Sequence, residues 1–434
     1  MIEAAVNSFR IPDLRQKLLF TAAMLVAFRF IANVPVPGVD VEALRALFES
    51  NQLIGMLDLF SGGALSSFSV AAMGVYPYIT AQIIMQLMVP VIPKLQEIAN
   101  EGESGRNRLN QWTHYLTVPM AFLQAFGTVQ FINATTPQPV ITNFGFDKDP
   151  LATFALLVSM TAGTMLLIWI GELITQQGIG NGISLIIFGG IVAALPRATW
   201  QSVATRQDLQ AFVPLIVFVV LSLATTYAIV FVYEGQRRIP VQYAKRLRGN
   251  RWYGGGTTHI PLRVNSAGMI PLIFASSLMI FPGTVASYFQ HTGNDFVDTF
   301  ARFVYDMFYL GTSWVYWVLF FLLVVGFTFF YALVLFEQQK IAETLQKHGG
   351  FIPGIRPGRP TQEYLYKVLT RITWGGAIFL GLVAVLPFIA RNITQIQALT
   401  LSSTALLIVV GVVLDTIKQL EAQLLMRHYQ GVIR

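Results

Sequence analysis

The sequence predicts an all-α protein that crosses a membrane many times. Of its 434 residues, 54% are hydrophobic and only 12% are charged, a balance that leaves too few polar residues to cover a soluble globule. The apolar residues gather into ten runs of roughly membrane length, and Lys and Arg lie mainly on one side of these runs. Together these observations indicate a polytopic membrane protein.

The ten runs fit helices better than barrel strands. A helix needs about 20 residues to cross a hydrocarbon core of roughly 30 Å. Each run is long and lacks the alternation of a barrel strand, and a helix satisfies all backbone polar groups within its own segment. In chain order the expected spans are 18–34, 74–92, 114–134, 151–171, 183–198, 211–233, 267–287, 313–336, 374–390 and 399–417.

The basic residues predict the orientation of these spans. If the amino terminus is inside the cell, the inner segments carry 22 of the 29 Lys and Arg residues and the outer loops carry 6. Short cytoplasmic loops retain positive charge. We therefore expect both termini in the cytoplasm.

The composition argues against several kinds of chemistry. With no cysteine, the chain has no disulfide, iron–sulfur cluster or thiol nucleophile. Phosphate-binding and dinucleotide-binding fingerprints are absent, and the QQGIGNGIS stretch lies between two spans, where its glycines favour a tight turn. The sequence therefore predicts neither an enzyme nor a bound cofactor or metal, since the five histidines share no ligand spacing: His114, His259, His291, His348 and His428.

The segment 59–73, LFSGGALSSFSVAAM, is unusual because it is rich in Gly, Ala and Ser and too short to cross the membrane. It precedes the second span on the expected outer side. Small side chains let a short helix fit a narrow space, and broken helices at membrane depth occur only inside protein or beside a cavity. An ordinary outer loop is the alternative interpretation.

Two polar regions, 234–266 and 337–371, hold 13 of the 29 basic residues. In the second, Pro357 favours an extended Arg356, and Gly354 and Gly358 permit bends on either side, so we expect Arg356 to project from a stiff tip. In the first, basic residues surround Tyr243, Trp252 and Tyr253, a mixture suited to an RNA backbone or an acidic protein surface. Attraction to anionic lipid is an equally good explanation. The basic residues are Arg237, Arg238, Lys245, Arg246, Arg248 and Arg251.

At this level of detail the chain resembles the SecY family, the channel subunits of the bacterial Sec protein translocon, also called the SecY/SEC61-alpha family. The resemblance covers nearly the whole chain. It rests on seven segments in the family's order: SGGALSS, PYITAQII, EGESGR, GIGNGIS, QRRIPVQYAKR, VNSAGMIPLIFASS and PGIRPGRPT. One such segment would be weak, whereas seven in order are specific.

The resemblance implies ten transmembrane helices in two pseudosymmetric inverted halves of five, residues 1–198 and 199–434. It also implies that the SGGALSS segment is a short re-entrant plug helix that closes the outer funnel of the channel. The plug residues would be Ser61, Gly62, Gly63, Ala64, Leu65, Ser66 and Ser67.

The resemblance further implies a constriction of aliphatic side chains, here called the pore ring. Its members by motif position are Ile79, Ile83, Ile187, Ile191, Ile273 and Ile408. Branched aliphatic side chains offer no hydrogen bonds, so a narrow ring of them resists wetting. A lateral gate to lipid would lie near Gln82, Gln86, Ser276 and Ser277, although packing or ordinary interhelical hydrogen bonding is the commoner role of such residues.

The expected location is the cytoplasmic membrane, and the expected activity is translocation of unfolded secretory polypeptides and release of membrane segments into lipid. The implied partners are SecE, SecG, the SecA ATPase, the ribosome, signal-bearing preproteins and membrane lipids, with docking at Arg356 and the basic residues of 234–266. Two other classes stay open from the residues alone. A secondary transporter for a small solute explains the ten spans but not the basic regions, and a membrane scaffold leaves the 59–73 segment without a role.

Overall fold

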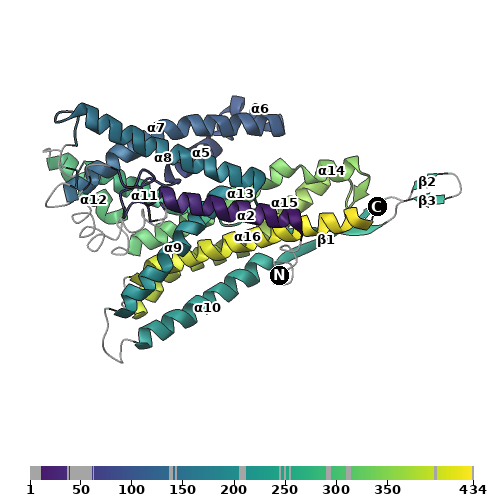
Figure 1. The fold of residues 1–434 in the computed structure, drawn as a ribbon. Helices are drawn as coiled ribbons and strands as arrows, with labels where there is room; N and C mark the ends of the chain where they lie inside the picture. The colour runs from purple at the N-terminus through teal and green to yellow at the C-terminus, as the bar shows by residue number, and fades with distance from the viewer. Residues whose placement is uncertain are drawn as a thin grey trace. The chain divides into compact units, whose positions relative to one another are not determined.

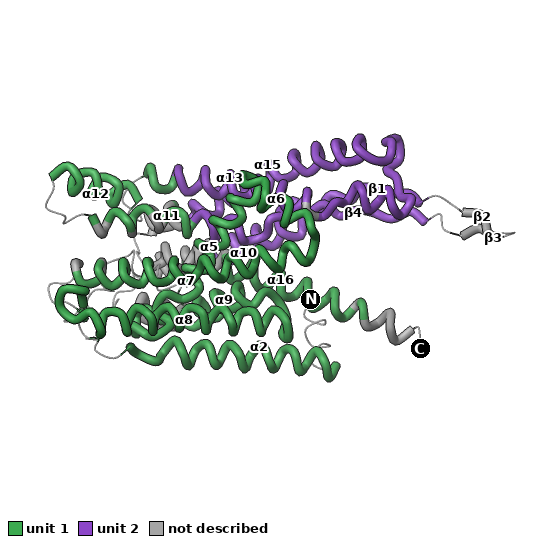
Figure 2. The backbone as a smooth tube through the Cα atoms, turned by 90° about the horizontal axis from the view of Figure 1, so that it is seen from above, with its two compact units in different colours: residues 1–218, 276–317, 387–434 green, residues 219–275, 318–386 purple. Residues whose placement is uncertain are grey.

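The computed structural model describes residues 11–36, 39, 61, 63–135, 140–141, 144–204, 212–243, 246–248, 251–253, 256–289, 295–308, 314–394 and 398–432. These residues separate into two compact units, coloured differently in Figure 2. Unit 1 comprises 1–218, 276–317 and 387–434, and unit 2 comprises 219–275 and 318–386.

A helix overlaps each of the ten apolar runs (Figure 1). These helices are α2 (Pro12–Ile31), α5 (Tyr76–Met88), α7 (Glu103–Thr135), α8 (Pro150–Gln177), α9 (Gly182–Ala204), α10 (Phe212–Glu234), α11 (Ile270–Tyr288), α13 (Trp314–Gln339), α15 (Arg359–Thr394) and α16 (Ala398–Val432). Within the described residues, three helical stretches are long and apolar enough to cross a membrane: Pro150–Gln177, Trp314–Lys347 and Arg359–Leu386.

Several helices do not coincide with the apolar runs that predict them. Helix α7 starts at Glu103 and α15 starts at Arg359, so both begin well before their apolar runs. The second run contains α5 alone, and the short helix α6 (Pro93–Asn100) follows it at an angle of 98° to α5. Pro90 and Pro93 lie at this break, where a proline removes a helical hydrogen bond.

In unit 1, the turn predicted from GIGNGIS is present and joins two tightly packed helices. Helix α8 ends at Gln177 and α9 begins at Gly182, with Gly180 in the left-handed region at φ 91°. A methyl group on Gly182 would collide with the Gly171 carbonyl, so only glycine permits this approach. The turn also anchors α2, because the Thr21 hydroxyl accepts a hydrogen bond from the Ile179 N–H at 3.2 Å.

Residues 63–75, which precede α5, are mostly buried in unit 1. Residues 63–75 form consecutive turns, so the short helix expected over 59–73 is not present in residues 63–73. Their backbone pairs with the residues that follow α2, since Val36 N–H donates to the Phe68 carbonyl at 2.9 Å and Val70 N–H donates to the Val34 carbonyl at 3.0 Å. Of the remaining residues of the predicted segment, Ser61 is described as helical, and 59, 60 and Gly62 lie outside the described residues.

Unit 1 also contains a helix that the sequence did not predict, α12 (Asp295–Phe308), between α11 and α13. It is shorter than a membrane span and carries Asp295, Asp298, Arg302 and Asp306 among its apolar residues. Those charges conceal it in a hydropathy profile tuned to membrane-length runs.

In unit 2, the two basic regions fold together into one small sheet. Strand β1 (Gln236–Tyr243) pairs antiparallel with β4 (Thr257–Arg263) along one edge and with β5 (Gly350–Phe351) along the other. Strands β2 (Arg246–Arg248) and β3 (Arg251–Tyr253) form a separate hairpin between β1 and β4. We call the β4-β1-β5 sheet, the β2–β3 hairpin and the turn that follows β5 the basic platform.

A hydrophobic core supports the basic platform. Val241 and Ile239 point to the buried face of β1, and helix α14 (Ile341–Lys347) and the start of α15 contribute Leu345 and Leu365. Alternate residues of β1 are exposed, as expected for a strand with one face on a core. From the sequence, both regions were predicted only as polar loops, because the basic residues of QRRIPVQY obscured the alternation of apolar and polar residues that is typical of a strand.

Candidate functional site

The residues predicted for the pore ring are all buried, and five of them belong to unit 1. Ile79 and Ile83 lie on α5, Ile187 and Ile191 on α9, and Ile408 on α16, which packs against α9. Each pair spaced by four residues lies on one side of its helix. Ile273 is buried in unit 2. Convergence of the six side chains on one axis stays a prediction.

Helices α5 and α11 are joined by a buried hydrogen bond between distant parts of the sequence. The Tyr76 hydroxyl donates to the backbone carbonyl of Ser277 at 3.0 Å. Ser276 and Ser277, both predicted for the lateral gate, are buried near this bond. We call the contact region of Tyr76 with Ser276 and Ser277 the α5–α11 seam.

Two polar atoms of the predicted gate residues are buried without a hydrogen-bond partner among the described residues, namely Gln86 Oε1 and Ser277 Oγ. Gln82 and Gln86 themselves are half-buried on α5. A buried polar atom without a partner costs about 1–3 kcal/mol, so these groups favour any state in which water reaches them. The side chains predicted for the gate are therefore more polar than a fully closed helix interface requires.

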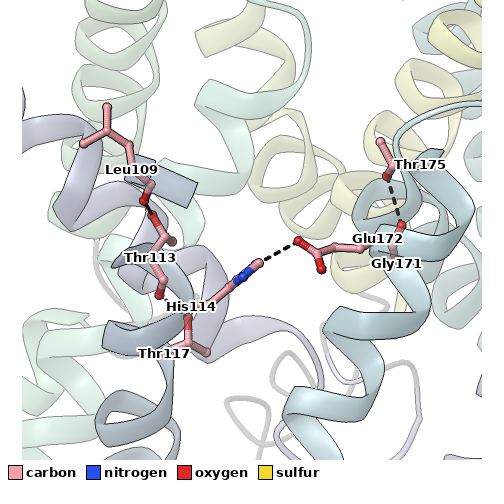
Figure 3. Close-up of polar contacts among 7 residues, drawn as sticks. All are labelled: Leu109, Thr113, His114, Thr117, Gly171, Glu172 and Thr175. Carbon is pink, nitrogen blue, oxygen red and sulfur yellow. Dashed lines mark hydrogen bonds and ion pairs between the residues drawn. The ribbon is translucent and has the colours of Figure 1, made fainter. Parts of the chain in front are cut away.

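Helices α7 and α8 are linked by a contact that sequence reasoning missed, between His114 and Glu172 (Figure 3). The His114 Nε2 and Glu172 Oε1 atoms lie 3.1 Å apart, but their alignment is not that of a hydrogen bond, so the attraction depends on a protonated imidazole. His114 also packs on the ring of Tyr78, with centroids 5.6 Å apart. The available signal was that both residues lie at the expected cytoplasmic ends of their apolar runs.

The described plug residues make local contacts that hold the segment in place. Ser61 Oγ accepts a hydrogen bond from Leu65 N–H at 3.0 Å, and Ser67 Oγ donates to the Ala32 carbonyl at 2.8 Å. Ala64 and Leu65 are fully buried. Helix α8 approaches the same segment so closely that a methyl group on Gly163 would collide with the Val70 carbonyl. Gly163 of α8 thus permits close packing against the segment, and the role of the segment as a plug stays a prediction.

The basic platform exposes the residues predicted for docking wherever their side chains are described. Arg237 and Arg238 are exposed on β1. Arg246, Arg248 and Arg251 lie on the β2–β3 hairpin, and Lys245 lies outside the described residues.

Arg356 is exposed at a turn between β5 and α15, as predicted. Gly354 and Gly358 flank it at φ 81° and 99°, and its carbonyl accepts a hydrogen bond from the Thr361 hydroxyl at 2.8 Å. Arg356 therefore lies at an exposed turn with a bend on either side, and its role in docking stays a prediction.

Comparison with known proteins identifies relatives along the whole chain. The family model SecY matches residues 69–417. The protein translocase subunit SecY of Streptomyces scabiei is 42% identical, and that of Halalkalibacterium halodurans is 45% identical; both alignments cover 100% of each chain.

Solved structures share the fold at lower sequence identity. A protein-conducting channel superposes with a TM-score of 0.64 at 17% identity, covering 94% of this chain and 92% of the other. A SecY protein whose plug domain stabilises the closed state of its channel gives 0.65 at 18% identity with the same coverage. Sec61 from a canine ribosome-channel complex gives 0.61 at 15%, again with the same coverage.

Proposed function

The chain belongs to the SecY family, and we propose from this membership that it forms the protein-conducting channel through which a Sec translocase moves unfolded polypeptides across the cytoplasmic membrane. The observation that carries this proposal is the match over the full length of the chain to protein translocase subunits at 42–45% identity. The match lends no support to a secondary transporter for a small solute. Hydrophobic segments of a client would leave the channel sideways into lipid.

The proposed topology has ten spans in two inverted halves, residues 1–198 and 199–434, with both termini in the cytoplasm. A helix at each apolar run supports the number of spans. The excess of Lys and Arg in the inner segments supports the orientation. In this topology the basic platform faces the cytoplasm and α12 lies on the outer side.

The proposed barrier to ions consists of the pore ring and the plug segment together. Burial of all six isoleucines supports a dry, narrow waist, because such side chains offer water no hydrogen bonds. Burial of Ala64 and Leu65 supports a second layer, on the side of the ring that the topology makes external. A translocating chain would displace the segment without meeting a polar side chain in the ring.

The proposed lateral gate opens along the α5–α11 seam. The seam is closed by the Tyr76 hydrogen bond, which a passing signal sequence would have to break. The buried polar atoms of Gln86 and Ser277 support this assignment, because an apolar interface would be cheaper if the seam never opened.

The proposed docking surface for the SecA ATPase and for the ribosome is the basic platform, with Arg356 at its tip. Exposure of Arg237, Arg238 and Arg356 supports this role, since acidic protein surfaces and RNA backbones both attract guanidinium groups. Structural relatives include the canine ribosome-channel complex and a yeast Ssh1 complex bound to the 80S ribosome. No ATP-binding motif is present in the sequence, so energy would come from a partner; SecE and SecG are the proposed membrane subunits.

Protease protection of a radiolabelled preprotein would test this function. Vesicles would contain this chain with SecE, and SecA and ATP would be added outside. We expect protection that requires both ATP and an intact signal sequence. Absence of protection, with verified insertion of the chain and an active control channel, would contradict the proposal.

A further inference from the structure

Helix α12 presents three distinct faces along its axis. Ala301 is buried, with Val297 and Val304 half-buried beside it. Phe296, Phe300 and Phe303 form a second face at helical spacing and are 81%, 63% and 65% exposed. The third face is polar and exposed, with Asp295, Thr299, Arg302 and Asp306.

The buried face of α12 places the helix against α11. The Phe308 Cβ lies in van der Waals range of a side chain built on Gly283, which follows Pro282 in the outer half of α11. Both residues belong to unit 1. Helix α12 therefore packs against the C-terminal half of α11, the half that lies further along the chain from the basic platform.

The connections keep α12 close to the membrane surface in the proposed topology. Six residues separate α12 from α11 and five separate it from α13. Such links reach at most about 3.3–3.6 Å per residue, or roughly 20 Å. Because α11 and α13 are proposed spans, α12 cannot lie far from the outer headgroups. Trp314, the first residue of α13, directly follows the connection from α12 and is 70% exposed, as expected for an aromatic side chain in the membrane interface.

Parallel apolar and polar stripes on one helix match a planar boundary between hydrocarbon and water. We propose that α12 lies in the outer membrane interface, with Phe296, Phe300 and Phe303 in the acyl region and the Asp295, Arg302 and Asp306 stripe in water. The inference rests on the proposed function, because the outer position of α12 comes from that topology. It adds an outer lipid anchor for α11, one of the two helices of the seam.

The charge of α12 indicates how it binds lipid. Its net charge is negative, with three aspartates and one arginine. Attraction to anionic headgroups therefore cannot hold it at the membrane, and burial of the three phenylalanines must do so. The depth of the helix should be independent of the fraction of anionic lipid.

Spin labelling tests the inference directly, because the chain contains no cysteine to remove. Phe296→Cys, Phe300→Cys and Phe303→Cys would each be labelled with a nitroxide in the full chain with SecE, in phosphatidylcholine vesicles. Asp306→Cys and Thr299→Cys are matched controls on the polar face. We expect the ratio of oxygen collisions to collisions with a water-soluble nickel reagent to be severalfold higher at the three phenylalanine positions than at the controls. This ratio should not change when roughly a third of the lipid is anionic phosphatidylglycerol.

Two outcomes would overturn the inference. Nickel collisions at Phe300→Cys equal to those at Asp306→Cys would place the face in water, and few collisions with either reagent at all three positions would show that protein covers it. Transport by each labelled variant is measured separately. Lack of transport with a lipid-exposed label would count against the proposed function alone, whereas normal transport with a water-exposed label would count against the anchor alone.

Discussion

The Tyr76 hydroxyl donates a hydrogen bond to the backbone carbonyl of Ser277, joining residues that are 201 positions apart in the chain. Both groups are buried, so the bond is protected from competing water. Since α5 and α11 meet here, the free energy of this one bond contributes directly to closure of the proposed gate.

Tyr76→Phe should favour the open gate. The change removes the donor, whereas the Ser277 carbonyl keeps its place in the hydrogen-bond pattern of α11, so the closed state loses the net contribution of one hydrogen bond, about 0.5–1.5 kcal/mol. We expect the variant to transport a preprotein with a weakened signal sequence up to roughly tenfold faster, since about 1.4 kcal/mol corresponds to a factor of ten. Protease protection of that preprotein measures the effect.

Tyr227→Phe is the matched control for this prediction, because Tyr227 is 74% exposed on α10. It should behave as the unmodified chain. Equal transport by Tyr76→Phe and Tyr227→Phe would show that the bond does not restrain the gate.

Replacing Ile187 and Ile191 together with Asn should increase ion leak severalfold through the channel in reconstituted vesicles. Amide side chains would hydrogen-bond water inside a waist that is otherwise dry. The control is Val192→Asn on the same helix, where the side chain is 40% exposed. A leak that is the same in both variants would remove α9 from the pore ring.

Arg356→Glu should leave the protein in the membrane but reduce SecA-driven transport by about tenfold or more, because like charges facing each other across an interface cost several kcal/mol. Transport rate and SecA binding to vesicles both report the change. Lys148→Glu, an exposed lysine between α7 and α8, provides a charge-matched control on the expected outer side. Normal transport by Arg356→Glu would refute docking at this tip.

Val241→Asp should unfold the basic platform. Val241 is fully buried in the core beneath β1, and an unpaired charge there costs about 3 kcal/mol or more. We expect faster cleavage of 234–266 and 337–371 by protease added to the cytoplasmic side. Gln242→Asp adds the same charge on the exposed side of the strand, and similar cleavage of the two variants would contradict the role of the core.

Much of the helical fold could be predicted from the sequence, because a membrane span requires an apolar run whatever its neighbours are. The exact ends could not. Charged residues at the start of α7 and α15 are compatible with helix outside lipid, so each of these helices begins before its apolar run does. Helix α12 was missed for the related reason that its phenylalanines alternate with aspartates.

The candidate site divides in the same way. The tip at Arg356 followed from local rules, since Gly354 and Gly358 adopt the positive φ angles that their positions suggested. The bond from Tyr76 to Ser277 and the contact of His114 with Glu172 could not be predicted, because nothing local relates residues on separate helices. The pore ring rested on family resemblance, since a buried isoleucine in a helix has no feature of its own.

The pairing of β1 with both β4 and β5 has a consequence for anyone who exchanges parts between relatives. Gln242 pairs with Phe351 and Tyr243 pairs with Gly350. A graft of either polar region alone would therefore bring an unpaired strand edge and only part of the hydrophobic core, which the host chain would not complete. A chimaera that carries 234–266 and 337–371 from the same donor keeps that register. The two regions should therefore be exchanged together as one structural unit, although 70 residues, or about 20 helical turns, separate them along the chain.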